Sequence, residues 1–160
     1  SETILAEKQP VCEIRDMPAV KIVSIREIVQ YAEIAEKMGK MYGELLKFNQ
    51  KENIEMIDVP ISIYHKFDGP TIDLECAIPV NELPENTTDK IQGREIAANN
   101  YVHADHFGDY QKLGETHQFI QDWMNKRQLN LNGSPIERYF TDPQQEPDTA
   151  KWHTSIYYPL

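Results

Sequence analysis

Glu137 and Tyr139 are the side chains best suited to do chemistry in this sequence. They stand two residues apart in residues 135–141, a run that is typical of a β-strand. Alternate residues of a strand point to the same face, so the carboxylate and the phenol share one face, and Ile136 and Phe140 share the other. If Ile136 and Phe140 face the helices, then Glu137 and Tyr139 face a groove on the opposite side of the sheet.

A carboxylate in an apolar groove costs several kcal/mol unless an opposite charge accompanies it. A cationic ligand would supply that charge to Glu137, and each aromatic wall would add roughly 0.5–2 kcal/mol of cation–π attraction. The alternative is a salt bridge from Glu137 to an arginine or lysine on a neighbouring strand. The residues alone leave both interpretations open.

Four further aromatic side chains are candidate walls of this groove. Tyr64 takes the equivalent place in an earlier strand, although an ordinary half-buried strand tyrosine would fit the pattern as well. Tyr110 follows a glycine where a helix begins, and Tyr157 is favoured over its neighbours in the last strand. Trp123 lies on the apolar stripe of a helix, where core packing is the alternative role.

The sequence favours neither a metal ion nor a cofactor. His103 and His106 are three residues apart in an extended run, so they point to opposite faces, and the other histidines are scattered. There is no glycine-rich phosphate loop, no nucleophile elbow and no C-x-x-C pair. Cys12 and Cys76 are expected to be reduced thiols, as is typical of the cytoplasm.

Length and charge define the broad class of the protein. A chain of 160 residues is expected to form one domain, which we assign to residues 11–160, preceded by a flexible leader at residues 1–10. The formal net charge of −10 argues against direct contact with nucleic acid, whose phosphates would repel the chain. No apolar stretch approaches the roughly 18 residues that span a membrane, so we expect a cytoplasmic protein.

The hydrophobic pattern predicts the order β-α-β-β, repeated once. Residues 11–26 are extended, and residues 28–48 carry an apolar stripe at helical spacing. The remaining predicted elements are a hairpin of residues 60–67 and 72–80, an extended run within 93–106, a helix at 113–127, and strands at 135–141 and 152–159.

The two halves align at their hairpins, where residues 60–64 match residues 135–139. In the first of these strands, strict alternation places Phe67 on the face of Ile61 and Ile63. The repeat predicts an α+β fold of two pseudo-symmetric β-α-β-β units. We expect an antiparallel sheet with two helices on one face and a ligand groove on the other.

Three motifs follow one another along the chain: Gly108-x-Tyr110-x-x-Leu113, Glu137-x-Tyr139-x-x-Asp142-Pro143 and the ending Ile156-Tyr-Tyr-Pro159. Together they resemble the GyrI-like small-molecule-binding domain, which also serves as the effector-binding domain of AraC-type regulators. The resemblance implies a twofold-pseudosymmetric antiparallel sheet and a pocket lined by aromatic residues around a carboxylate. One departure is Ser155, where the family often has Glu, and it puts a second pocket carboxylate in doubt.

The resemblance implies that the domain binds a small amphipathic molecule, often a cationic one, and we expect binding of a cationic, aromatic ligand in preference to catalysis. It implies two rival functions as well. One is a hydrolase of strained or electrophilic molecules such as cyclopropanoids. For such a reaction the residues of this sequence offer Glu137 with Tyr64 or Tyr157 as an acid–base pair. The other is an inhibitory protein that binds DNA gyrase. A DNA-binding domain would be a separate module, so we expect no direct contact between this chain and nucleic acid.

Overall fold

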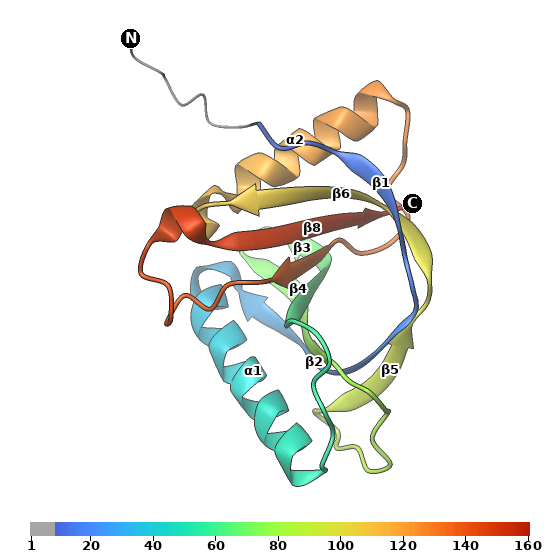
Figure 1. Ribbon diagram of the computed structural model, residues 1–160, viewed down its shortest axis with the longest axis vertical. Helices are drawn as coiled ribbons and strands as arrows, with labels where there is room; N and C mark the ends of the chain where they lie inside the picture. Colours follow the sequence, from blue (N-terminus) through green and yellow to red (C-terminus); the bar gives the residue numbers. More distant parts are fainter. Residues whose placement is uncertain (1–8) are drawn as a thin grey trace.

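The computed structural model describes residues 9–160, which form one curled antiparallel sheet and two helices (Figure 1). Most of the leader expected at residues 1–10 lies outside the described residues. The strands are β1 Glu13–Met17, β2 Val20–Gln30, β3 Ile61–Asp68, β4 Thr71–Pro79, β5 Gln92–Ile96, β6 Asn99–Phe107, β7 Ile136–Tyr139 and β8 His153–Pro159. The helices are α1 Ile34–Lys51 and α2 Leu113–Lys126, each preceded by a 3-10 turn, at Tyr31–Glu33 and Tyr110–Lys112, and a third such turn covers Thr149–Lys151.

The strand order confirms the predicted internal repeat. The strand order in the sheet is β1-β6-β8-β7-β3-β4-β2-β5. If each strand is replaced by its equivalent in the other half (β1 by β5, β2 by β6, β3 by β7, β4 by β8), the same order results in reverse. The halves meet where β3 pairs with β7, and there Ser62 lies directly opposite Glu137. These two residues are equivalent in the alignment of the repeats, so the pseudo-twofold axis passes between them.

Each helix covers one end of the sheet, with α1 on β2 and β4 and α2 on β6 and β8 (Figure 1). The predicted apolar stripe of α1 is buried through Met41, Leu45 and Phe48, and α2 buries Ile120 and Met124. Because the helices pack on β2 and β4 and on β6 and β8, the central pair β3 and β7 has no helix directly above it.

The first helix begins later than its hydrophobic spacing predicts. Residues 28–30 belong to β2, where Ile28 pairs with Asp73 and Val29 with Ile72, and Val29 is buried. Sheet pairing therefore outcompetes helix formation in this segment. The extended run expected within 93–106 divides into β5 and β6, with a break at residues 97–98.

A bulge in β3 changes the face of Phe67. The register with β4 shifts between Tyr64 and Lys66, which leaves His65 as the extra residue. Phe67 therefore stacks on Tyr64, with ring centroids 6.1 Å apart, and does not share the face of Ile61 as strict alternation predicts.

Two further features concern the expected environment of the chain. No helix within residues 9–160 is long and apolar enough to cross a membrane. Cys12 and Cys76 are both free thiols, the first half-buried and the second buried.

Candidate functional site

A large cavity opens between α1 and α2 on the face of the sheet that carries the helices. Its volume is about 1680 Å³, and its walls include Ile34 and Met38 from α1 and Leu113 and His117 from α2. The prediction that the groove lies on the face opposite the helices is therefore wrong. The two helices leave the middle of their own face open, whereas the opposite face buries an apolar cluster of its own, formed by Ile22, Ile61, Ile63 and Ala77.

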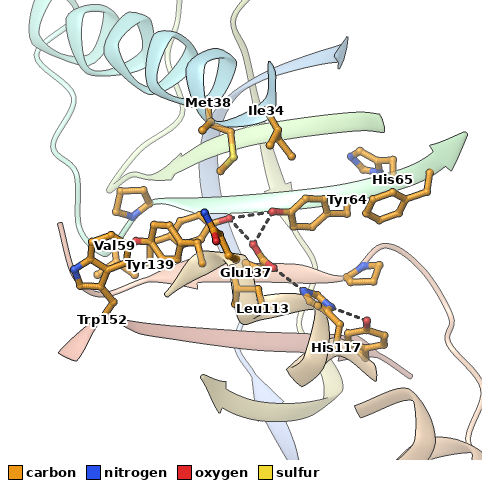
Figure 2. Close-up of a pocket in the computed structure, with 18 of the residues that line it drawn as sticks. Ile34, Met38, Val59, Tyr64, His65, Leu113, His117, Glu137, Tyr139 and Trp152 are labelled. Atoms are coloured by element: carbon orange, nitrogen blue, oxygen red, sulfur yellow. Dashed lines mark hydrogen bonds and ion pairs between the residues drawn. The ribbon is translucent and has the colours of Figure 1, made fainter. Parts of the chain in front are cut away.

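Glu137 lies on the floor of this cavity and is only 2% exposed. Its Oε1 accepts hydrogen bonds from the hydroxyls of Tyr64 and Tyr139, each at 2.6 Å, and its Oε2 lies 2.6 Å from Nε2 of His117 (Figure 2). Glu137 and Tyr139 share a face, as strand periodicity predicts, but that face is the one that carries the helices. In residues 9–160 these hydrogen bonds come from two phenols and an imidazole, not from the arginine or lysine of the alternative interpretation.

The surroundings of Glu137 favour its ionised form. Burial alone would raise the pKa of this carboxyl. The hydrogen bond and the electrostatic attraction from His117, together with the hydrogen bonds from Tyr139 and Tyr64, outweigh burial and hold the pKa below its ordinary value. Burial and the neighbouring carboxylate raise the pKa of both tyrosines well above the ordinary value. Tyr64 and Tyr139 therefore remain protonated and act as hydrogen-bond donors to a buried anion.

A chain of hydrogen bonds extends from Glu137 to α2. Nδ1 of His117 lies 2.7 Å from the hydroxyl of Tyr158, which accepts a hydrogen bond from Gln121 at 3.2 Å. Every group is satisfied if Tyr158 donates to Nδ1 and Nε2–H donates to Glu137. These hydrogen bonds fix the imidazole of His117 between Tyr158 and Glu137.

Aromatic rings flank the carboxylate on two sides. Tyr110 lies on the cavity wall as expected, 4.9 Å from the ring of Trp152 and 5.9 Å from that of Tyr139. On the other side, Phe67 stacks on Tyr64 and lies 6.4 Å from Tyr31. In Figure 2, Trp152 and Val59 appear on one side of Glu137 and His65 on the other.

Two of the expected wall residues lie elsewhere. Tyr157 is 2% exposed on the opposite face of the sheet, where it contacts Tyr101 and accepts a hydrogen bond from Arg138. Strand alternation places its neighbour Tyr158 on the cavity wall instead. Trp123 lies outside the main cavity, since it packs against the core of the second half beneath the guanidinium of Arg127.

Ser155 also points away from the cavity, and it donates a hydrogen bond to Asp105 on the opposite face. The presence of serine at position 155, where the family often has glutamate, therefore does not affect this pocket. Glu75 is 3% exposed on the face opposite the cavity. Its carboxylate accepts hydrogen bonds from Arg94 and Ser24 and contacts His65.

Sequence reasoning missed the histidine of the site, although the repeat holds the signal that would have found it. His117 is separated from Tyr42 by the same number of residues as Glu137 is from Ser62. The pairs are also equivalent in space, since the hydroxyl of Tyr42 lies 2.8 Å from that of Ser62. One half thus has a Tyr–Ser pair where the other half has the His–Glu pair. Among residues 9–160, no group of three or more His, Cys, Asp or Glu side chains is arranged to hold a metal ion.

The curled sheet with its helix-lined cavity and buried carboxylate defines a small-molecule-binding domain. Residues 10–160 match the model of the GyrI-like small molecule binding domain. The chain belongs to this family, and the match confirms the resemblance that the three motifs indicate.

Solved structures share the same fold. The C-terminal domain of EcmrR superposes with a TM-score of 0.80 at 21% identity, covering 94% of this chain and 96% of that one. In a complex with DNA, the EcmrR chain superposes with a TM-score of 0.84 at 22% identity, covering 94% of this chain, which spans only 57% of that EcmrR chain.

More distant structures include SAV2435 bound to tetraphenylphosphonium, with a TM-score of 0.64, 14% identity and 93% of each chain covered. A hydrolase encoded by lin2189 from Listeria innocua has a TM-score of 0.61 and 13% identity, covering 92% of this chain and 90% of that one. No curated protein matches the sequence significantly.

Proposed function

We propose that this domain captures an amphipathic organic cation and that Glu137 is its counter-charge. The observation that carries the proposal is a carboxyl group, 2% exposed, at the floor of a large aromatic-walled cavity. Its hydrogen bonds come from Tyr64, Tyr139 and His117. These donors stabilise the carboxylate as an anion.

The energetics favour a cation that also carries apolar surface. A buried anion attracts an opposite charge strongly, because the surrounding protein screens the interaction less than water does. Rings such as Trp152 and Phe67 add cation–π attraction and bury apolar ligand surface. The formal net charge of −10 raises the local concentration of cations around the protein.

Two of the structural neighbours are consistent with this role. SAV2435 was solved with tetraphenylphosphonium, a lipophilic cation, and EcmrR was solved in a complex with DNA. We infer that this chain serves as the effector domain of a cytoplasmic regulator. In that arrangement the contact with DNA comes from a separate module, and this chain touches the ligand.

Isothermal titration calorimetry with two probes of the same shape tests the proposal. Tetraphenylphosphonium and tetraphenylborate both carry four phenyl groups, but their charges are opposite. We expect saturable binding of the phosphonium and none of the borate. Equal binding of both probes, or no binding of the phosphonium, would contradict the proposal.

Removing the two phenol donors should make binding sensitive to acid. In the double variant Tyr64→Phe/Tyr139→Phe, Glu137 loses two hydrogen bonds to its ionised form, so its pKa rises. In the parent protein the lowered pKa lets Glu137 keep its charge down to a low pH. In the variant the pKa is higher, so Glu137 is protonated and loses its charge at a higher pH. The affinity for tetraphenylphosphonium, measured from pH 4 to 8, should therefore decline at a higher pH in the variant. Superimposable pH profiles would show that the phenols do not maintain the charge.

Hydrolysis in the same pocket is the second candidate function. The contact between Glu137 and Tyr64 supplies a carboxylate beside a phenol, as an acid–base pair requires, and one structural neighbour is a hydrolase. Consumption of an electrophilic substrate in excess over the protein would favour this function over capture. The gyrase alternative stays a prediction, to be tested by a pull-down at low and high salt.

A further inference from the structure

Two aromatic clusters flank Glu137, and two of the three residues in each cluster are equivalent in the internal repeat. We name them the tryptophan end, formed by Tyr110, Tyr139 and Trp152, and the phenylalanine end, formed by Tyr31, Tyr64 and Phe67. All six side chains line the same cavity. The carboxylate therefore lies between two aromatic surfaces and not at the end of a single slot.

The equivalence of the two ends follows from the repeated chain. Tyr31 and Tyr110 each open the 3-10 turn that precedes a helix. Tyr64 and Tyr139 occupy matching positions of β3 and β7, and both donate to the same oxygen of Glu137. The two phenols thus join the central charge to an aromatic cluster on each side.

The cavity is larger than a single compact ligand requires. Its volume of about 1680 Å³ exceeds the roughly 300–1,000 Å³ that is common for small-molecule sites. The two ends also differ in access, because Phe67 and Tyr31 are 63% and 57% exposed, whereas Trp152 and Tyr110 are half-buried. The phenylalanine end is therefore the more open of the two.

We propose that the pocket selects cations with two aromatic arms, one on each side of a central positive charge. The proposal rests on the function proposed above, since it assigns the central charge to Glu137. One arm packs into the tryptophan end and the other against the phenylalanine end. A cation with a single arm fills only one end, and a cation without arms fills neither.

A series of three quaternary ammonium ions tests this ligand class by calorimetry on the intact chain. Tetramethylammonium has no aromatic arm, benzyltrimethylammonium has one and dibenzyldimethylammonium has two. We expect the affinity to rise by roughly tenfold with each arm, since ring contacts of this kind are worth about that factor. The two-armed ion should bind with a stoichiometry of one.

Variants at the two ends identify where the arms lie. Phe67→Ala removes an exposed ring and Trp152→Ala a half-buried one, and each should lower the affinity for the two-armed ion by roughly tenfold. Only one of them should weaken the one-armed ion by that factor. Phe107→Ala is the matched control, because Phe107 is 66% exposed and does not line the cavity. Thermal unfolding of each variant checks its fold, and Phe67→Ala keeps the test valid if Trp152→Ala does not fold.

Failure of this inference and failure of the proposed function give different results. If the one-armed and two-armed ions bind equally and Glu137→Gln weakens both, the two-arm assignment is overturned and the cation site stands. A stoichiometry of two for the two-armed ion also overturns it. If none of the three ions and no tetraphenylphosphonium binds, the proposed function itself fails.

Discussion

Replacing Glu137 with glutamine is expected to weaken the binding of tetraphenylphosphonium by at least about 100-fold. Two unit charges about 6 Å apart attract by about 3 kcal/mol at an effective dielectric constant of about 20, and each 1.4 kcal/mol is a factor of about ten in affinity. The side chain is buried, so solvent does little to screen this charge. Glutamine keeps the volume of the side chain, removes the charge and replaces one acceptor oxygen with an NH2 donor, so calorimetry of Glu137→Gln measures the loss of the charge together with the loss of one acceptor.

Tyr157→Phe is the control for this experiment. Tyr157 is as well buried as Glu137 but lies on the opposite face of the sheet, where its hydroxyl accepts a hydrogen bond from Arg138. This variant should keep the affinity of the parent protein. If Glu137→Gln binds the phosphonium as tightly as Tyr157→Phe does, Glu137 is not the counter-charge.

The second large effect is expected on stability. Glu75→Ala should lower the free energy of unfolding by about 2 kcal/mol, because hydrogen bonds to a charged group contribute about 1.5–3 kcal/mol and the Glu75 side chain is buried, although Arg94 is exposed. The carboxylate accepts hydrogen bonds from Arg94 at 2.7 and 3.0 Å and from Ser24 at 2.6 Å, and it lies 2.8 Å from Nε2 of His65. Its loss leaves the buried hydroxyl of Ser24 without this partner.

The destabilisation by Glu75→Ala should depend on pH. Burial would raise the pKa of Glu75, but the hydrogen bonds from His65, Arg94 and Ser24 outweigh burial and hold the pKa well below its ordinary value. A carboxyl with a lowered folded pKa contributes stability above its unfolded pKa of about 4.3 and loses that contribution as the pH falls towards the folded value. Urea unfolding should therefore show the full difference between parent and variant at pH 7 and a smaller one at pH 3.

Glu85→Ala is the matched control, because Glu85 is exposed in the loop between β4 and β5. This substitution should change the free energy of unfolding by less than about 0.5 kcal/mol. Equal stability of Glu75→Ala and Glu85→Ala at pH 7 would show that the buried cluster around Glu75 does not stabilise the fold.

Period-two alternation and the internal repeat predict much of the fold and the centre of the site. The repeat aligns Ser62 with Glu137, and the structure pairs these two residues across its central strands. Alternation correctly places Glu137 and Tyr139 on one face, and the motif Gly108-x-Tyr110 correctly indicates an aromatic residue on the cavity wall. These features depend only on local geometry, which the sequence specifies directly.

The features that the sequence did not reveal depend on contacts between distant segments. Alternation pairs Glu137 with Tyr139 but does not say which face the helices cover, and the groove was therefore assigned to the wrong side. In the last strand it separates Tyr157 from Tyr158 without saying which of them faces the cavity. His117 lies on another element than Glu137, and only the packing of α2 on β6 and β8 brings the two together.

A crystal structure of the chain with tetraphenylphosphonium tests the central claim most directly. The account predicts the phosphorus atom inside the cavity between α1 and α2, about 6 Å from the nearer oxygen of Glu137, a range over which opposite charges still stabilise one another. A phosphonium bound elsewhere on the surface, or bound in the cavity with its centre remote from Glu137, would contradict the account.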